Sequence, residues 1–429
     1  LVGVPEFRFS DYQSWIEERF APRHFQKLKE KMDWPAQYAI GCFIQALGRN
    51  PGMEAALQNL AQQAHVYVGT GVGSLDTTYK ASIRLHEAQQ RWDAFWANRT
   101  PELREYLAEL AEIENLGIEG KIEAGKLHSI REKEKRRAKL QEKWNAPEPP
   151  WSVSADVIWN IHNTPAAQIS ILGKIKGLSF APVAACSTFG VALRLAMRAI
   201  QSGDAKAVVV GATDPPPHPL LVGSFYTARV LAASGNVSVP LTRLQGTHVA
   251  GGAVVWILGD LDYMTAKGFE PVGMEPLAVG VSSDAEHIIT PSIEGPKAAI
   301  LEALEDAGAK PENLGSWDLH ATATPGDYSE IATFRSIFPG PVVIAARKGT
   351  FGHGMSAGGG WELTAQYLGY EQGELFPTPL KEDDLNANIR QVHERFVFDA
   401  GCEVTPGLAG KLSMGIGGIN ACVISRPLR

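Results

Sequence analysis

Cys186 is the residue of this sequence whose type and setting first suggest catalytic chemistry. It lies between the apolar residues 179–183 and a segment whose apolar residues recur at helical intervals until Ser202. This pattern predicts a strand, a tight turn and a helix. Unpaired N–H groups at a helix N-terminus favour the thiolate, which is the nucleophilic form of cysteine. A buried structural cysteine fits the same residues equally well, because free cysteines are among the most buried side chains.

Three later segments also place polar side chains in turns rich in glycine or other small residues. The first carries His320, the second carries Lys348 and His353 five residues apart, and the third is a glycine-rich hairpin at residues 412–421. Nucleophilic catalysis combines a cysteine with groups that move protons or hold an oxyanion. One cysteine, two histidines and one lysine in four such turns therefore form a candidate catalytic constellation.

These segments resemble the motifs of the β-ketoacyl-acyl carrier protein synthases, the condensing enzymes of the thiolase superfamily. That family has its nucleophile in A-C-[SA]-[ST], a histidine in H-[GA]-T-x-T-x-x-G-D, a lysine and a histidine in K-x-x-x-G-H, and a closing G-[FI]-G-G-x-N. All four motifs occur here in family order, although the His320 motif is one residue short before Gly326. The resemblance covers most of residues 36–80 and 155–425.

The resemblance implies an α/β fold of the thiolase type, with five αβαβα layers built from two similar halves. We expect residues 1–265 to form the half that carries the nucleophile and residues 266–429 to form the half that carries both histidines. Strand-like and helix-like segments alternate in both halves, which agrees with buried sheets covered by helices. Residues 81–150 depart from the family and predict a helical insertion in the first half.

The predicted insertion is polar, and it ends at the proline-rich residues 147–150. Residues 131–143 hold seven basic and three acidic residues. A solvated helical hairpin accounts for this composition. A basic surface for an acidic carrier protein is the functional alternative, because complementary charges speed docking. The apolar residues of the insertion include Trp92, Phe95, Trp96, Leu103, Leu107, Leu110 and Ile113, and its tryptophans are expected to pack the hairpin.

The overall composition is that of an ordinary globular protein. Of the 429 residues, 45% are hydrophobic and 20% charged, and the net charge of −7 argues against nucleic acid as the main partner. The sequence shows no membrane-length apolar run and no signal-peptide pattern, so we expect a cytoplasmic protein. The cysteines Cys42, Cys186, Cys402 and Cys422 are far apart, which disfavours a disulfide framework or a zinc site.

The beginning of the chain differs from that of a condensing enzyme, which opens with a buried strand and a glycine turn. We therefore expect residues upstream of the given sequence, or loops absent from its numbering. The strand-like residues 65–68 run into the glycine turn 69–73, and such a turn can cradle a phosphate. No basic residue follows at Walker spacing, and the resemblance implies that this turn is a packing element beside the active site. His218, in the proline-rich loop 214–219, is interpreted as structural.

The reaction implied by the resemblance is a decarboxylative Claisen condensation. It needs an acyl-accepting nucleophile, and it needs stabilisation of an oxyanion and of the enolate left by a decarboxylating malonyl thioester. By resemblance Cys186 is the nucleophile, and the backbone N–H groups of Cys186 and Ile416 form the oxyanion hole.

The resemblance also assigns roles to the polar side chains of the other motifs. His320 and His353 would donate hydrogen bonds from neutral imidazoles to the malonyl thioester carbonyl. Lys348 would orient and polarise the site, with Glu362 as its ion partner. We expect neither an organic cofactor nor a metal. The residues expected to contact substrate are Phe189, Thr322, Thr324, Phe351, Met355, Gly417 and Gly418.

The implied substrates are malonyl-acyl carrier protein and an acyl primer carried by CoA or by acyl carrier protein, and the implied assembly is a homodimer. The insertion and the spacing look most like a divergent bacterial subgroup that starts fatty-acid chains from acetyl-CoA with a Cys-His-His set. Bulky groups at Phe189, Phe351, Met355 and Ile416 would suit a short primer, because a long acyl chain would overpack the pocket. These side chains could equally be core residues beside a tunnel that runs elsewhere.

Other members of the superfamily remain as alternatives. An elongating or polyketide-type ketosynthase would take primers from acyl carrier protein. A degradative thiolase would use a second cysteine, but Cys422 falls in an apparent strand after the glycine turn. A non-catalytic partner subunit would lack Cys186, and a Cys-His-Asn synthase would have asparagine in place of His353.

Overall fold

The computed structural model describes residues 6–120, 123–150, 155–233, 238–390 and 395–428. They form two compact units, which we call the α/β unit (Leu1–Leu75 with Trp159–Arg429) and the helical unit (Asp76–Ile158). The helical unit extends a few residues beyond both ends of the predicted insertion, residues 81–150. The division of the rest of the chain near residue 265 stays a prediction.

The first sheet of the α/β unit has the strand order β2-β1-β3-β4. β1 pairs in parallel with β2 and β3, and β4 is antiparallel to β3. Both β1 and β3 are buried at every residue, because helices cover both faces of the sheet. The strands are β1 (Ala64–Gly69), β2 (Ser179–Phe180), β3 (Ala207–Asp214) and β4 (Gly252–Gly259).

The second sheet has the order β5-β12-β11-β6-β7-β9, and a separate pair is formed by β8 and β10. β11 and β12 are antiparallel, with Gly415 opposite Ile419 at the turn, which confirms the predicted glycine hairpin. The strands are β5 (Met274–Ser283), β6 (Leu314–Asp318), β7 (Val343–Ala345), β8 (Glu374–Leu375), β9 (Arg395–Phe396), β10 (Cys402–Glu403), β11 (Leu408–Gly415) and β12 (Ile419–Pro427).

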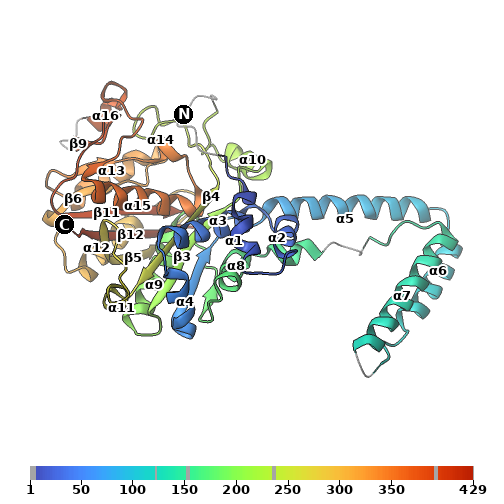
Figure 1. Cartoon of the computed structure of the whole chain (residues 1–429). Coiled ribbons are helices and arrows are strands. Elements are labelled where there is room, and N and C mark those ends of the chain that lie inside the picture. The colour runs from blue at the N-terminus through green and yellow to red at the C-terminus, as the bar shows by residue number, and fades with distance from the viewer. Residues whose placement is uncertain (1–5, 121–122, 151–154, 234–237, 391–394, 429) are drawn as a thin grey trace. The chain divides into compact units, whose positions relative to one another are not determined.

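Helices complete five layers, as Figure 1 shows for the α/β unit. α3 (Trp34–Arg49) and α8 (Thr164–Gly173) pack on the outer face of the first sheet, and α12 (Glu294–Asp306) packs on the outer face of the second, beside α13 (Gly326–Ile337). α9 (Thr188–Gln201) and α15 (Met355–Gln372) lie between the sheets. This arrangement confirms the predicted αβαβα fold. The remaining helices of the unit are α1 (Gln13–Glu17), α2 (His24–Lys31), α4 (Met53–Leu60), α10 (Pro219–Thr227), α11 (Leu261–Ala266), α14 (Lys348–Phe351) and α16 (Ala387–Arg390).

Two glycines allow the central helices to approach their neighbours closely. A Cβ on Gly190 of α9 would lie 2.7 Å from the Cβ of Ala421 on β12. A Cβ on Gly360 of α15 would lie 2.8 Å from the ring of Phe189. Real Cβ atoms do not come this close, so glycine permits the packing that fixes the start of α9, directly after Cys186.

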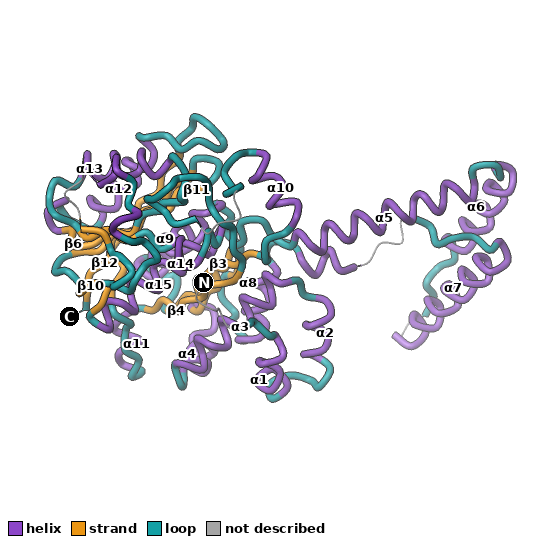
Figure 2. The backbone as a smooth tube through the Cα atoms, turned by 90° about the horizontal axis from the view of Figure 1, so that it is seen from above, coloured by secondary structure: helices purple, strands orange, loops and turns teal. Residues whose placement is uncertain are grey.

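The helical unit contains only helices among its described elements (Figure 2). They are α5 (Leu75–Trp96), α6 (Thr100–Glu114) and α7 (Glu123–Trp144), followed by a 3₁₀ segment. Trp92, Trp96, Tyr106, Leu110 and Leu140 form its core, with Phe95, Leu103, Ile113 and Trp144 partly buried against it. The tryptophans therefore pack this unit, as expected from the sequence, whereas Leu107 is exposed on α6.

Two sequence-based expectations concern the chain as a whole. All four cysteines are free thiols, in agreement with the absence of a disulfide framework. Within the described ranges, no helix combines the length and the apolar character needed to cross a bilayer.

Candidate active site

Cys186 lies at the predicted strand-to-helix turn. β2 ends at Phe180, and a single 3₁₀ turn over Ala185–Ser187 leads into α9. Ala185 adopts a φ of 47°, an uncommon conformation for a residue with a side chain. The Ser187 hydroxyl donates to the carbonyl oxygen of Ser413 at 3.0 Å, which ties the turn to β11. The surrounding structure thus holds Cys186 in a strained, well-defined turn.

The environment of the Cys186 thiol differs from the expectation based on a helix N-terminus. Burial raises its pKa to about 11, although hydrogen bonding from the Ile416 backbone N–H and the positive charge of Lys348 act in the opposite direction. The cost of placing a thiolate in a buried site outweighs both stabilising effects. Cys186 therefore rests as a thiol, with the Ile416 N–H directed at its sulfur.

The two predicted histidines come together from separate elements. His320 follows β6 and His353 follows α14, and their ring centroids are 5.5 Å apart. The Nδ1 atom of His353 accepts a hydrogen bond from the Met355 N–H at 3.0 Å. In a neutral ring this bond leaves the proton on Nε2, which is then free to donate. The Nδ1 atom of His320 is buried and has no hydrogen-bond partner among the described residues.

Both imidazoles are neutral in this environment. Burial, reinforced by the positive charge of Lys348, lowers the pKa of His353 to about 3. Burial and Lys348 also lower the pKa of His320 well below its usual value. The pair can therefore donate hydrogen bonds near neutral pH without carrying charge, as the sequence-based assignment requires.

Acidic residues hold the His320 loop in place, and sequence reasoning missed their role. The Glu330 carboxylate accepts hydrogen bonds from the N–H groups of His320 at 2.6 Å and Ala321 at 2.7 Å. The Asp327 carboxylate accepts from the N–H groups of Thr322 at 2.9 Å and Leu241 at 3.0 Å. Asp327 belongs to the G-D pair of the histidine motif, so one signal was available. Glu330 had no signal beyond an acidic residue on a buried helix face.

The main chain of His353 is also fixed by a neighbouring loop. Its N–H donates to the His248 carbonyl at 2.6 Å, and its carbonyl accepts from the Ala250 N–H at 2.9 Å. This short parallel bridge joins residues 247–250 to the site. Because both polar main-chain groups are engaged, the ring of His353 is held by its backbone as well as by Met355.

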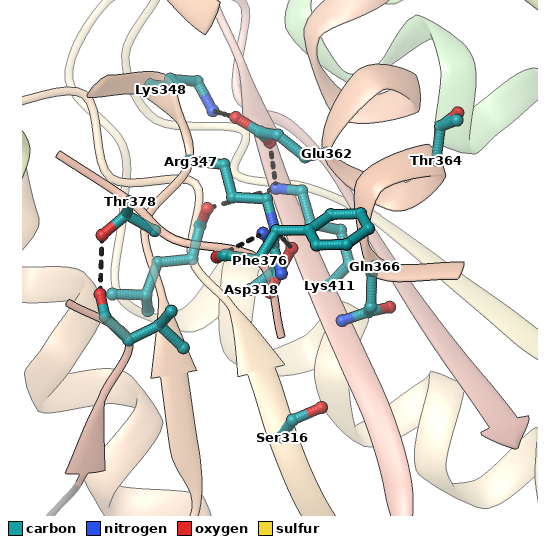
Figure 3. Close-up of polar contacts among 12 residues, drawn as sticks. Ser316, Asp318, Arg347, Lys348, Glu362, Thr364, Gln366, Phe376, Thr378 and Lys411 are labelled. Atoms are coloured by element: carbon teal, nitrogen blue, oxygen red, sulfur yellow. Dashed lines mark hydrogen bonds and ion pairs between the residues drawn. The ribbon is translucent and has the colours of Figure 1, made fainter. Parts of the chain in front are cut away.

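Lys348 forms the predicted ion pair with Glu362, at 2.8 Å between Nζ and Oε1. A second lysine, Lys411 on β11, lies 2.8 Å from Oε2 of the same carboxylate. Figure 3 shows both ammonium groups directed at Glu362. Next to them, Arg347 Nε lies 2.6 Å from Asp318 Oδ2 in a second buried ion pair. Sequence reasoning missed Lys411, Arg347 and Asp318.

The glycine turn after β1 binds a carboxylate of the protein itself. Asp214 Oδ1 accepts from the N–H groups of Gly71 at 3.0 Å and Val72 at 2.8 Å, and Oδ2 accepts from the Ser356 N–H at 2.8 Å. These bonds support the interpretation of the turn as a packing element. His218 also has a structural contact, because its Nδ1 accepts from the Leu220 N–H at the start of α10.

The residues predicted to contact substrate have varied environments. Phe189 is fully buried and packs edge-to-face against Trp256, and Met355 is buried beside His353. Phe351 and Ile416 are partly open to solvent, at 36% and 38% exposure. Their contacts with substrate stay predictions.

The polar positions predicted to contact substrate bond within the protein. The hydroxyl groups of Thr322 and Thr324 lie 2.9 Å apart, and the Gly417 N–H donates to the Ile288 carbonyl at 2.7 Å. Gly418, with a φ of 70°, turns the hairpin, and its N–H donates to Gly415. These groups shape the loops, and their direct contact with substrate stays a prediction.

The arrangement as a whole suits chemistry that generates negative charge on a carbonyl oxygen. A cysteine, a backbone N–H at its sulfur, two neutral imidazoles and a buried lysine can accept an acyl group and hold an enolate. Within the part of the chain that the structure describes, no group of three or more His, Cys, Asp or Glu side chains is arranged to hold a metal ion.

Comparisons with known proteins match two family models to this chain. A family model described as the N-terminal domain of β-ketoacyl synthase matches residues 114–262, and one described as its C-terminal domain matches residues 275–380. Together they account for more than half of the chain.

Curated relatives share this similarity over part of their length. A 3-oxoacyl-[acyl-carrier-protein] synthase 2 of Staphylococcus aureus is 27% identical over 272 residues, which cover 60% of this chain and 65% of that protein. The chloroplastic 3-oxoacyl-[acyl-carrier-protein] synthase I of Hordeum vulgare is 28% identical over 286 residues, covering 63% of this chain and 59% of that protein. The chain thus spans less than two-thirds of the length of these relatives.

Solved structures share the fold over nearly the whole chain. The ishigamide ketosynthase/chain length factor superposes with a TM-score of 0.72 at 19% identity, covering 99% of this chain and 87% of that one. A β-ketoacyl synthase from Burkholderia phymatum gives a TM-score of 0.68 at 18% identity with the same coverage. A type II polyketide ketosynthase in complex with its acyl-carrier protein gives 0.69 at 17% identity, covering 92% and 85%. At such identities the likeness concerns the fold.

Proposed function

Because the chain belongs to the β-ketoacyl synthase family of the thiolase superfamily, we propose that it catalyses the decarboxylative condensation of a malonyl thioester with an acyl group held on Cys186. The observation that carries this proposal is the meeting of His320 and His353 as two neutral imidazoles, with ring centroids 5.5 Å apart. The extender is malonyl-acyl carrier protein, and the product is a 3-oxoacyl thioester.

In the first half-reaction Cys186 takes up the primer. The thiol loses its proton as its sulfur attacks the acyl thioester carbonyl, and the carrier thiol leaves with a proton. The backbone N–H groups of Cys186 and Ile416 bind the oxyanion of the tetrahedral intermediate. Burial raises the pKa of the thiol, and the same burial excludes the water that would hydrolyse the acyl enzyme. The buried position of Cys186 therefore suits this half-reaction.

In the second half-reaction the malonyl thioester loses carbon dioxide. The electron pair of the broken C–C bond becomes the enolate, whose oxygen accepts hydrogen bonds from His320 and His353. The enolate carbon then attacks the acyl carbon on Cys186, a C–C bond forms, and the C–S bond breaks to release the Cys186 thiolate, which takes up a proton from solvent to restore the thiol. Lys348, held by Glu362, contributes positive charge while negative charge develops.

We assign a short primer, delivered as acetyl-CoA, and hence the start of fatty-acid chains. Phe189 supports this assignment, because it lies three residues after the nucleophile and is fully buried against Trp256 and Gly360. A long acyl chain that extended from Cys186 past Phe189 would have to displace the phenylalanine ring, and such overpacking typically costs about 1–3 kcal/mol. The assembly is a cytoplasmic homodimer.

The carrier protein is the partner that we assign to the exposed basic face of α7. Arg131, Lys135, Arg136 and Lys139 are exposed on this helix, whereas Leu140 packs in the core. Complementary charge would speed encounter with an acidic carrier more than it would strengthen the bound complex.

The decisive experiment offers the protein malonyl-acyl carrier protein with a ladder of acyl-CoA and acyl-carrier primers, and identifies products by mass. We expect a 3-oxoacyl product, carbon dioxide release, and higher kcat/KM for acetyl-CoA than for octanoyl-carrier protein. A clear preference for octanoyl-carrier protein would make the protein an elongating or polyketide-type synthase. If the protein neither decarboxylates malonyl-acyl carrier protein nor forms a condensation product, the remaining interpretation is a non-catalytic partner subunit, like the chain length factors named among the structural neighbours.

A further inference from the structure

Lys411 is a buried lysine for which the proposed chemistry has no assigned role. It lies in the middle of β11, five residues before Ile416, and is 1% exposed. Lysine is among the residues least often fully buried, because taking an ammonium group out of water is costly unless it is paired. The burial of Lys411 in a central strand next to the glycine turn therefore suggests that this lysine serves the function of the site.

The ammonium group of Lys411 joins two parts of the site. It lies 2.8 Å from Glu362 Oε2, on α15, and it donates to the carbonyl of Leu319 at 3.3 Å. Leu319 directly precedes His320. A further bond to the Leu412 carbonyl uses its third donor. Lys411 thus connects the carboxylate that holds Lys348 to the main chain that holds His320.

Four elements place charged side chains around the two imidazoles. Lys348 on α14 and Lys411 on β11 share the single carboxylate of Glu362 on α15. Glu330 on α13 binds the main chain of the His320 loop. Two ammonium groups on one buried carboxylate leave a positive field on the side where enolate charge would develop.

We infer that Lys411 is a positioning residue for decarboxylation: by sharing Glu362 with Lys348 and holding the Leu319 carbonyl, it fixes Lys348 and the His320 loop relative to each other. This inference rests on the proposed function of the site. Lys411 acts on the enolate through these neighbours and does not touch the substrate.

The electrostatic environment agrees with this geometry. Burial and Lys348 are the main causes that lower the pKa of His320 and of His353, and Lys411 contributes in the same direction to both. The main causes that shift the pKa of the Cys186 thiol are burial, the Ile416 N–H and Lys348. Because the Lys411 ammonium contacts Glu362 and the main chain of Leu319 and Leu412, we expect it to affect the histidine half-reaction more than the cysteine half-reaction.

The test compares two variants of this chain with the wild type. Lys411→Met removes the charge and the donors, and Lys411→Gln removes the charge but keeps an amide donor. Acylation of Cys186 and decarboxylation of malonyl-acyl carrier protein are measured separately. We expect decarboxylation to fall about tenfold or more while acylation is retained within about twofold. The acid limb of the decarboxylation rate should move to higher pH, because a charge that disfavours imidazolium is lost.

Lys206→Met serves as the matched control. Lys206 pairs with Asp260 at the same 2.8 Å, but this pair is partly exposed, just before the start of β3 and just after the end of β4. It should leave both half-reactions unchanged. Equal loss of both half-reactions in a folded Lys411 variant, or unchanged decarboxylation in both folded variants, overturns the inference. If Lys411→Met does not fold, Lys411→Gln decides.

A double-mutant cycle keeps the inference testable if the wild-type protein neither acylates nor decarboxylates. The unfolding midpoints of Lys411→Gln, Glu362→Gln and the double variant are compared with that of the wild type. Direct coupling predicts that the two effects do not add, whereas additive effects would show that Lys411 does not position Glu362. An inert wild type with a coupled cycle would refute the proposed function and leave the positioning role of Lys411 in place.

Discussion

The buried ion pairs of the α/β unit and the surface ion pairs of the helical unit use the same residue types at similar distances. Lys348 and Glu362 are 2.8 Å apart with side chains 3% and 2% exposed. Lys143 and Glu109 are 2.6 Å apart with side chains 57% and 33% exposed. The two pairs differ in the solvent around them, and that difference sets what each can do.

Water screens the pairs on the helical unit, so they contribute little energy, although hydrogen bonds from Arg137 and Lys135 lower the pKa values of Glu114 and Glu132. In the α/β unit the same charges face each other without water. There, burial and nearby charge shift the pKa values of both histidines, of Glu330 and of Cys186. The comparison teaches that charged side chains can support the proposed chemistry in this protein only where the fold buries them away from solvent.

The largest effect on activity is expected in the buried site of the α/β unit, when the nucleophile is removed. Cys186→Ala should abolish condensation, and intact-mass analysis after exposure to an acyl thioester should find no acyl adduct. Replacing Cys42, Cys402 or Cys422 should leave activity, because none of them lies at the start of α9. Condensation at wild-type rate in Cys186→Ala would end the enzyme proposal.

The two histidines should separate the half-reactions. His320→Ala or His353→Ala removes an enolate donor and should slow decarboxylation about 100-fold or more, given the usual effect of losing such a donor. Acylation of Cys186 should survive in part, because the oxyanion hole of that step is formed by backbone N–H groups. Measuring carbon dioxide release and acyl-enzyme formation side by side checks this. Variants that decarboxylate normally but fail to acylate would reverse the assigned roles.

A matched pair of stability measurements tests the comparison itself. Arg347→Met leaves Asp318 buried without its partner and should lower the free energy of unfolding by about 3–5 kcal/mol. Lys143→Met in the helical unit breaks a pair at the same 2.6 Å and should cost less than about 1 kcal/mol. Urea denaturation of both variants gives the two values. Similar losses would mean that burial does not distinguish these pairs.

Glu330 should make stability depend on pH. Burial raises its pKa from 4.5 to about 7, so the folded state holds a proton that the unfolded state releases within this range. Its contribution to the free energy of unfolding, about 3 kcal/mol, is complete below pH 4.5 and is lost as the pH rises through 7. Glu330→Gln should flatten this decline in urea denaturation series. Parallel curves for the variant and the wild type would contradict the assignment.

The smallest effect is expected on the surface of the helical unit. Replacing Arg131, Arg136 and Lys139 by Gln should raise KM for carrier-bound substrate about two- to fivefold at low salt and change kcat little, because rim charges mainly affect encounter. The same protein should use acetyl-CoA unchanged. Since salt screens such charges, the difference from wild type should shrink at high ionic strength. A KM for carrier-bound substrate that stays at the wild-type value would remove α7 as the docking surface.

The sequence alone determined the parts of this protein that depend on local order. Alternating apolar runs and glycine turns predicted the layered α/β fold, the turn before α9 and the β11–β12 hairpin, because hydrophobic periodicity and turn residues act over a few positions. The motifs also picked out Cys186, His320, Lys348 and His353, whose spacing within each turn is short.

Only the tertiary structure decided how these groups behave. Lys411 and Glu330 lie outside the motifs, and nothing local in the chain marks them as partners of Glu362 and of the His320 loop. The sequence favoured a thiolate at Cys186, but the structure raises the pKa of that thiol, since desolvation depends on every element packed around the sulfur. Burial and long-range contacts are properties of the assembled layers, so they could not be obtained from residue types and spacing.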